Sequence, residues 1–89
     1  MRIDLFLKIT GLIKHRTRAR DACAQGAVTV DGLPAKPGRQ VRVGDRIRIA
    51  YPRRVLEVDV EALPEGSVPR SERTTYYRVV GETPRGWDE

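Results

Sequence analysis

The sequence predicts an α+β domain in which two packed N-terminal helices precede a small, mainly antiparallel sheet of about four or five short strands. Up to Gly26 the apolar residues recur at helical spacing, which is typical of one face of a helix. After Gly26 they alternate with polar residues in short runs, separated by glycine, proline and aspartate, as in strands joined by turns. A chain of 89 residues has room for one such domain.

The first helix is expected over residues 2–13. Ile3, Phe6 and Leu7 lie at helical spacing and begin an apolar stripe that would face the core. Asp4 lies in the first turn, where the positive end of the helix dipole stabilises a carboxylate. The helix therefore has one face for packing and a polar face left in solvent.

A second helix is expected over residues 18–25, with Thr17 as its N-cap. Its small residues share one face and would let the two helices pack closely: Ala19, Ala22 and Cys23. Gly26 follows as the residue that ends the helix in the left-handed conformation. Cys23 is predicted to be a small core residue rather than a nucleophile, because a reactive thiolate needs exposure and a basic neighbour.

Alternating or β-branched segments predict strands at residues 27–30, 46–51, 55–60 and 74–80. Asp31 and Gly32 form a tight turn after the first of these strands. In the second, Ile47 and Ile49 would face the core, so that the arginines between them point outward.

The remaining segments are expected to be irregular. Residues 33–40 and 63–73 each contain prolines and a glycine, so both are predicted to be mostly loop. Residues 81–89 are predicted to form a loose tail. This tail is either disordered or anchored by Trp87, its strong apolar residue.

Charge is unevenly distributed along the chain. The net charge of +5 arises from 17 Lys and Arg against 12 Asp and Glu, and 14 of the basic residues are Arg. Residues 1–54 hold 13 basic residues and four Asp, a net of +9, whereas residues 55–89 hold four Arg and eight acids, a net of −4. The basic part indicates a face for a polyanion. The arginine bias alone also fits a GC-rich or heat-adapted genome that favours Arg throughout. The acidic part would either repel nucleic acid and so orient its docking, or be solvated surface.

Catalytic chemistry is not expected from these residues. Cys23 is the single cysteine, so it forms neither an internal disulfide nor a thiolate cluster for a metal. His15 stands between Lys14 and Arg16 without a neighbouring carboxylate, and it is read as an RNA contact or solvated surface. No phosphate-binding glycine motif or long apolar run is found. We therefore expect no catalytic residue, metal or cofactor. The lack of a long apolar run predicts a cytoplasmic protein.

Basic residues gather on the two helices and their junction, and they are the candidates for RNA contacts: Arg2, Lys8, Lys14, Arg16, Arg18 and Arg20. Arg16 would stand at the start of the second helix, where backbone amides and a cation together hold a phosphate. The alternative is a solvated helical surface. The short second helix offers no pair of base-reading amide side chains, which favours recognition of backbone and shape in structured RNA.

These features, in this order, resemble the S4-type RNA-binding domain. The resemblance covers about residues 1–50 and is carried by Arg2-Ile3-Asp4, Phe6-Leu7, Arg16, Ala19, the run from Gln25 to Gly32, Lys36-Pro37 and the run from Val43 to Ile47. It implies the S4-type (αL) fold, with the paired helices as the RNA-facing surface. It also implies that Thr17 and Lys36 contact RNA. Asp4 is expected to pair with Arg16 across the helices and to orient it.

The segment 9–17 and the later stretch 68–77 are similar to the stand-alone branch that holds RqcP-like and heat-shock-protein-15-like proteins. That branch implies a non-catalytic protein that binds 23S rRNA of the large subunit and peptidyl-tRNA of stalled, split ribosomes. It would act beside an alanine-tailing factor in bacterial ribosome-associated quality control. A monomer is expected, because a small RNA-binding wedge needs no second copy, although the sequence leaves the oligomeric state open. No long basic C-terminal extension is present, which favours the shorter, RqcP-like form.

Under this interpretation, residues 1–50 are the S4-type motif, residues 51–80 are strands that complete the same domain, and residues 81–89 are the tail. Two other functions stay open. One is a general rRNA-binding assembly or heat-shock factor of the large subunit, which would show the same charge pattern. The other is a structural or chaperone-like protein without an RNA ligand.

Overall fold

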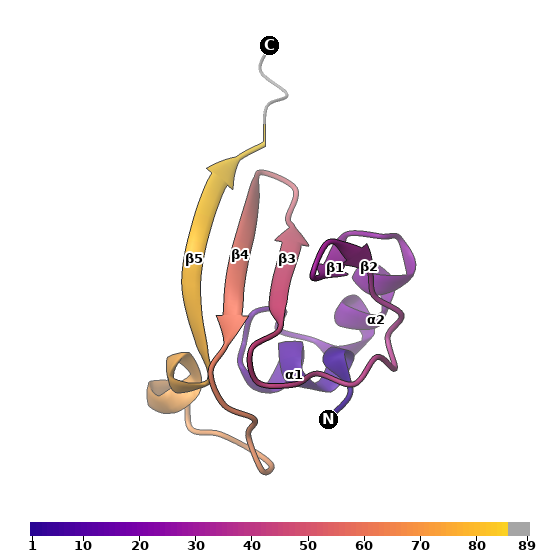
Figure 1. The fold of residues 1–89 in the computed structure, drawn as a ribbon. Helices are drawn as coiled ribbons and strands as arrows, with labels where there is room; N and C mark the ends of the chain where they lie inside the picture. Colours follow the sequence, from indigo (N-terminus) through magenta and orange to yellow (C-terminus); the bar gives the residue numbers. More distant parts are fainter. Residues whose placement is uncertain (86–89) are drawn as a thin grey trace.

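The computed structural model describes residues 1–85 of the chain and shows an α+β fold with a five-stranded antiparallel sheet, as predicted. The strand order is β2-β1-β3-β4-β5, and the two α-helices lie beside the β1–β3 end of the sheet (Figure 1). The elements are α1 (Ile3–Ile9), α2 (Arg16–Ala24), β1 (Val28–Val30), β2 (Leu33–Pro34), β3 (Arg46–Ala50), β4 (Arg54–Val60), the 3-10 helix η1 (Arg70–Tyr76) and β5 (Tyr77–Pro84).

Helix α1 is shorter than predicted. It ends at Ile9 rather than at residue 13, because Gly11 adopts a left-handed φ of 78° that a helix cannot continue through. Leu12 is nevertheless buried in the core, so the apolar pattern persists beyond the end of the helix. The backbone carbonyl of Leu12 accepts a hydrogen bond from the Tyr51 hydroxyl, which ties this segment to the end of β3.

Helix α2 begins earlier than predicted, at Arg16, and Thr17 is not its N-cap. His15 is the N-cap residue, with an extended backbone, and its carbonyl accepts the first helical hydrogen bond from the Ala19 amide at 3.0 Å. No side chain caps this end. At the other end Gly26 has a φ of 80°, so the predicted stop is confirmed.

The turn after β1 is confirmed, since Asp31 and Gly32 both have positive φ and join β1 to β2. The short strand β2 was not predicted: it lies within the proline-containing segment expected to be loop and pairs with β1 through Val30 and Leu33. In β3 the isoleucines are buried and the arginines exposed, as predicted.

The C-terminal part differs most from the sequence prediction. Residues 70–76 form η1, although 63–73 were expected to be loop and 74–80 a strand. Strand β5 starts at Tyr77 and continues to Pro84, so residues 81–84 belong to the sheet rather than to a loose tail. Pairing with β4 explains the extension, because Leu56 and Arg54 lie opposite Glu82 and Pro84. Trp87 lies outside the described residues.

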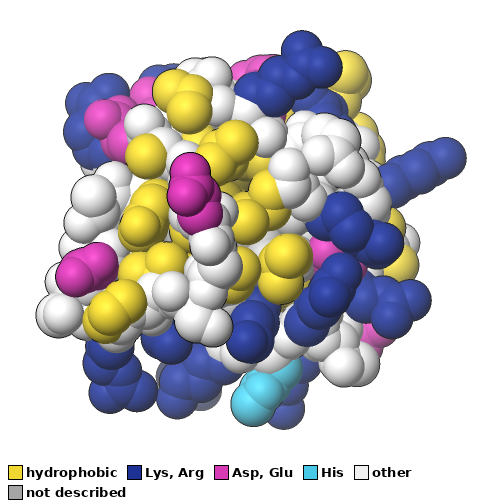
Figure 2. Space-filling view, turned by 90° about the horizontal axis from the view of Figure 1, so that it is seen from below, with side chains coloured by type: hydrophobic (Ala, Val, Ile, Leu, Met, Phe, Trp, Pro, Cys, Tyr) yellow, Lys and Arg dark blue, Asp and Glu magenta, His cyan; other side chains and the backbone are white. Residues whose placement is uncertain are grey.

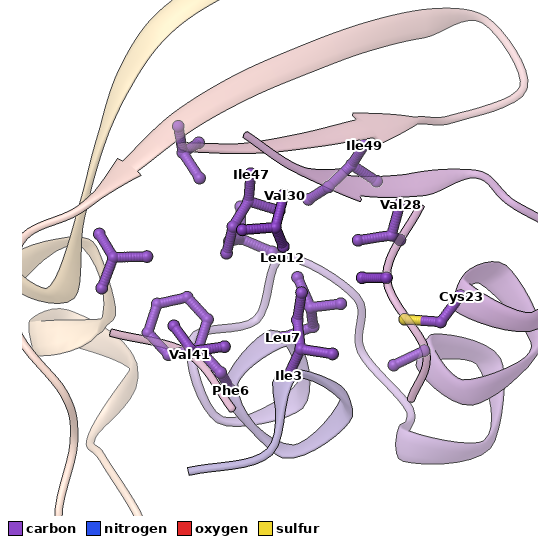
Figure 3. Close-up of a cluster of buried hydrophobic side chains, with 14 of the residues drawn as sticks. Ile3, Phe6, Leu7, Leu12, Cys23, Val28, Val30, Val41, Ile47 and Ile49 are labelled. Carbon is purple, nitrogen blue, oxygen red and sulfur yellow. The ribbon is translucent and has the colours of Figure 1, made fainter. Parts of the chain in front are cut away.

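One face of the sheet packs on the helices and forms the core (Figure 3). Phe6 and Leu7 of α1 point toward the strands, where they join Val30 and Ile47. Cys23 of α2 is part of this cluster, as predicted. No helix within residues 1–85 has the length and apolar character needed to cross a membrane.

The opposite face of the sheet carries charged side chains in register across three strands. Arg46 of β3 pairs with Asp59 of β4 at 2.8 Å, and Arg78 of β5 approaches the same carboxylate at 3.5 Å. Carboxylates therefore pair with both of these arginines on this face of the sheet.

Candidate nucleic-acid interface

A buried carboxylate joins the two helices at the centre of the candidate site. The Asp4 side chain has no exposed surface, and its two oxygens accept hydrogen bonds from Arg2 Nε at 3.2 Å and Arg2 Nη2 at 3.0 Å. Arg16 Nε lies 3.6 Å from Asp4 Oδ2, so the predicted pairing across the helices is present. A buried carboxylate requires such partners, since an unpaired charge in the interior is strongly unfavourable. The fork from Arg2 was not predicted.

Backbone hydrogen bonds connect the start of α1 to the loop of residues 36–40. The Ile3 amide donates to the Arg39 carbonyl at 2.8 Å, and the Asp4 amide donates to the Pro37 carbonyl at 3.3 Å. The first turn of α1, which carries Asp4, is therefore held against this loop. Lys36 is exposed at the start of this loop, next to the N-terminus of α1.

Three arginines surround Asp4 in an open groove, which we call the arginine groove. It has a volume of about 350 Å³ and is lined by Arg2, Asp4, Arg16, Thr17 and Arg20. The side chains of Arg2 and Arg16 are 46% and 45% exposed, so each keeps N–H donors in solvent while Asp4 holds its guanidinium in place. Three cations and one carboxylate leave the groove net positive, and Asp4 contacts two of the three guanidinium groups, those of Arg2 and Arg16. Such an arrangement suits phosphate.

The first turn of α2 adds backbone donors to this groove. Because no side chain caps the helix, the amides of its first turn have no side-chain acceptor. Because α2 begins at Arg16, both Arg16 and Thr17 belong to that turn, and their side chains lie beside the free amides. Such a helix start attracts anions through its amides and its dipole.

The other predicted RNA contacts are distributed around this centre. Lys14, His15 and Arg18 line a second groove on the other side of α2, which we call the Tyr51 groove. Lys8 in the last turn of α1 and Lys36 are exposed and line neither groove. Figure 2 shows dark blue basic side chains around the cyan histidine at one margin of the molecule, while apolar side chains occupy the middle of that face.

Tyr51 is a residue of this surface that the sequence did not single out. Its hydroxyl donates a hydrogen bond to the Leu12 carbonyl, and the Arg54 guanidinium lies 4.8 Å from the centre of its ring. Burial raises the pKa of this phenol. In the sequence, Tyr51 is merely the last residue of an alternating strand, and nothing there marks it as part of a binding surface. Its contact with the segment between α1 and α2 shows that it belongs to this surface.

Cys23 is buried beneath this surface, and its chemistry is that of a neutral core thiol. Burial, and secondarily the charge of Asp4, raises its pKa to about 11. The residues that the structure describes contain no group of three or more His, Cys, Asp or Glu side chains placed to hold a metal.

This arrangement of a basic helix pair backed by a small sheet is that of an RNA-binding module, and comparison with known families defines which one. The family model described as "S4 domain" matches residues 1–47, and the chain belongs to that family. Within it, the chain belongs with the proteins named RQC P-site tRNA stabilizing factor.

Relatives with that name match over nearly the whole chain. The protein of Halalkalibacterium halodurans is 40% identical over 84 residues, which cover 94% of both chains. That of Bacillus subtilis is 31% identical over 86 residues, which cover 97% of this chain and 99% of the relative. The Helicobacter pylori J99 protein is 40% identical over 77 residues and covers 85% of this chain and 92% of its own.

Two solved structures share the fold. The trimeric structure of heat shock protein 15 from Vibrio cholerae has a TM-score of 0.82 and 25% identity, covering 90% of this chain and 81% of that one. The solution structure of the hypothetical protein HP1423 has a TM-score of 0.78 and 36% identity, covering 91% and 98%.

Proposed function

We propose that this protein binds 23S rRNA of the large ribosomal subunit together with peptidyl-tRNA on stalled, split ribosomes. In this role it supports C-terminal alanine tailing in ribosome-associated quality control. The observation that carries the proposal is the arginine groove, in which Asp4 orients two half-exposed arginines beside the uncapped start of α2. The name of the relatives, RQC P-site tRNA stabilizing factor, supports tRNA as one of the ligands.

The site would act by holding RNA phosphates in fixed positions. Arg2 and Arg16 present guanidinium donors whose direction is set by Asp4, and the Thr17 hydroxyl adds a neutral donor. The remaining basic residues would extend contact along the RNA backbone: Lys8, Lys14, Arg18, Arg20 and Lys36. Guanidinium and ammonium groups stay charged and donate hydrogen bonds, so these residues suit binding rather than acid–base catalysis.

The proposal includes the setting in which the protein works. It acts in the cytoplasm as a monomer, on the same subunit as an alanine-tailing factor. A small protein of this shape needs no second copy to place a basic surface against RNA, since one recognition module buries on the order of 600–1,000 Å² of protein surface.

A second candidate is a general rRNA-binding assembly or heat-shock factor of the large subunit. The fold similarity to heat shock protein 15, with a TM-score of 0.82, is the observation that favours it. Both functions use the same basic surface, so they differ in the particle that is bound rather than in the residues that bind it.

Affinity capture of the tagged protein from lysate, followed by sequencing of the bound RNA, tests the proposal. Mature 23S rRNA together with tRNA, and little small-subunit rRNA, is the expected result. Precursor large-subunit rRNA without tRNA would instead support the assembly factor. Recovery of no RNA at low salt would contradict both functions.

A further inference from the structure

We propose that the Tyr51 groove binds one unpaired nucleobase of the RNA that lies along α2. This inference rests on the proposed function, namely that the protein binds RNA, and adds a site that reads an unpaired nucleotide. It assigns a role to a groove distinct from the arginine groove and built from three separate segments of the chain.

The interior of the Tyr51 groove is apolar. The groove has a volume of about 440 Å³ and lies between the segment after α1, one side of α2 and the end of β3. Its apolar lining consists of Leu12, Ile13, Ala22, Ile49, Ala50 and Pro52. Flat apolar ligands such as nucleobases gain from transfer out of water into a groove of this kind.

The rim of the groove carries basic side chains and no carboxylate. Lys14, His15 and Arg18 line it, whereas the arginine groove contains Asp4 and the neighbouring groove on α2 contains Asp21. An occupant that complements this site has an apolar body and a negatively charged edge. A nucleotide has both, because its base is flat and largely apolar on its faces and its phosphate is anionic.

The wall formed by Tyr51 is held in place before any ligand arrives. Its hydroxyl donates to the Leu12 carbonyl, and the Arg54 guanidinium covers the ring at 4.8 Å from its centre. Its backbone carbonyl accepts a hydrogen bond from Arg85 Nη1 at 3.0 Å. A preformed wall reduces the ordering cost of binding.

Continuity with the arginine groove favours an RNA nucleotide over an acidic peptide. Arg16 and Thr17 line the arginine groove, and His15 and Arg18 line the Tyr51 groove, yet all four are consecutive around the start of α2. An RNA strand whose phosphates contact this turn therefore passes both grooves. One base that leaves the stack at this point can enter the Tyr51 groove while the adjacent phosphates stay on α2.

The test compares two RNA hairpins that differ by one unpaired 2-aminopurine nucleotide in the stem. The full-length protein is expected to bind the hairpin with the unpaired nucleotide about tenfold more tightly, at the low end of what stacking one base contributes. Ala22→Leu fills the groove without changing charge, so it should remove this preference and leave affinity for the fully paired hairpin within twofold. Ala24→Leu, on the exposed side of the same helix, should keep the preference.

Equal binding of both hairpins by the wild-type protein would overturn the inference, as would an intact preference in Ala22→Leu. Binding of neither hairpin at low salt would contradict the proposed function itself, so the two failures are distinguishable. Amide chemical-shift mapping of the wild-type protein does not depend on the folding of any variant. Shifts at Ile13, Ala22 and Tyr51 with uridine monophosphate support the inference. Shifts there with an acidic amphipathic peptide and none with the nucleotide would assign the groove to a protein partner and overturn it.

Discussion

The guanidinium of Arg16, the first residue of α2, lies 3.6 Å from the fully buried carboxylate of Asp4 in α1. This contact links the packing of the two helices to the direction of a half-exposed cation. We expect this single carboxylate to stabilise the interior and also to orient the cation at the surface.

Asp4→Asn separates orientation from bulk charge. The variant increases the net positive charge, so electrostatic attraction alone would tighten RNA binding. We expect binding to weaken by about 1.5–3 kcal/mol instead, because Arg2 and Arg16 lose the charged acceptor that fixes them. Filter binding to a structured RNA measures this change. Asp21→Asn, on the exposed side of α2, is the matched control and should bind as well as wild type or better.

The same variant should lower the free energy of unfolding by about 1–3 kcal/mol, because its neutral amide pairs less strongly with the two arginines. Urea unfolding at neutral pH measures this loss. If Asp4→Asn is destabilised but binds RNA with unchanged affinity per folded molecule, Asp4 is structural only and does not orient the arginines.

Gly11→Ala tests why α1 ends early. At a φ of 78°, alanine costs about 1–2 kcal/mol from backbone strain alone. A Cβ at this position would also lie 3.0 Å from Nη1 of Arg73 in η1. We expect an additional loss of at most about 1 kcal/mol from this crowding, because the end of the Arg73 side chain has to shift. Gly26→Ala is the control, since it has a φ of 80° and open space around the new methyl group. Equal unfolding free energies for the two variants would contradict a contribution from Arg73.

The pKa of the Cys23 thiol predicts a loss of stability at high pH. Burial and the charge of Asp4 raise this pKa from 9.0 to about 11, so the folded protein holds the proton more tightly than the unfolded chain. The resulting stabilisation is complete below pH 9 and is lost as the pH rises toward 11, at up to about 1.4 kcal/mol per pH unit. Urea unfolding of wild type and Cys23→Ala at several pH values isolates this effect from Tyr51, whose pKa is also raised. Parallel pH profiles of the two proteins would contradict it.

Features set by local pattern were predictable from the sequence. The alternation of Ile47 and Ile49 with arginines determined both faces of β3, and Gly26 marked the end of α2. The pairing of Asp4 with Arg16 was also predictable, because both lie at the ends of helices that have to pack against each other. Their roles toward RNA stay predictions.

Features set by contacts between distant segments were not predictable. The apolar pattern continues through Leu12 beyond the true end of α1, and the packing of Arg73 against Gly11 joins residues far apart in the chain. Strand β5 extends to Pro84 because β4 offers it a pairing edge, although its last residues resemble a loop. The Tyr51 groove likewise exists only after three segments meet.

The most direct test of the RNA interface is a salt titration of binding to purified large ribosomal subunits carrying tRNA. Wild type should lose affinity steeply with salt, with a slope of about −4 to −6 for roughly six phosphate contacts. Arg16→Ala should bind at least tenfold more weakly at low salt, remain folded, and reduce the slope by about 1. Arg78→Ala, the same charge change on the far face of the sheet, should match wild type. If Arg16→Ala and Arg78→Ala behave alike, the arginine groove is not the RNA interface.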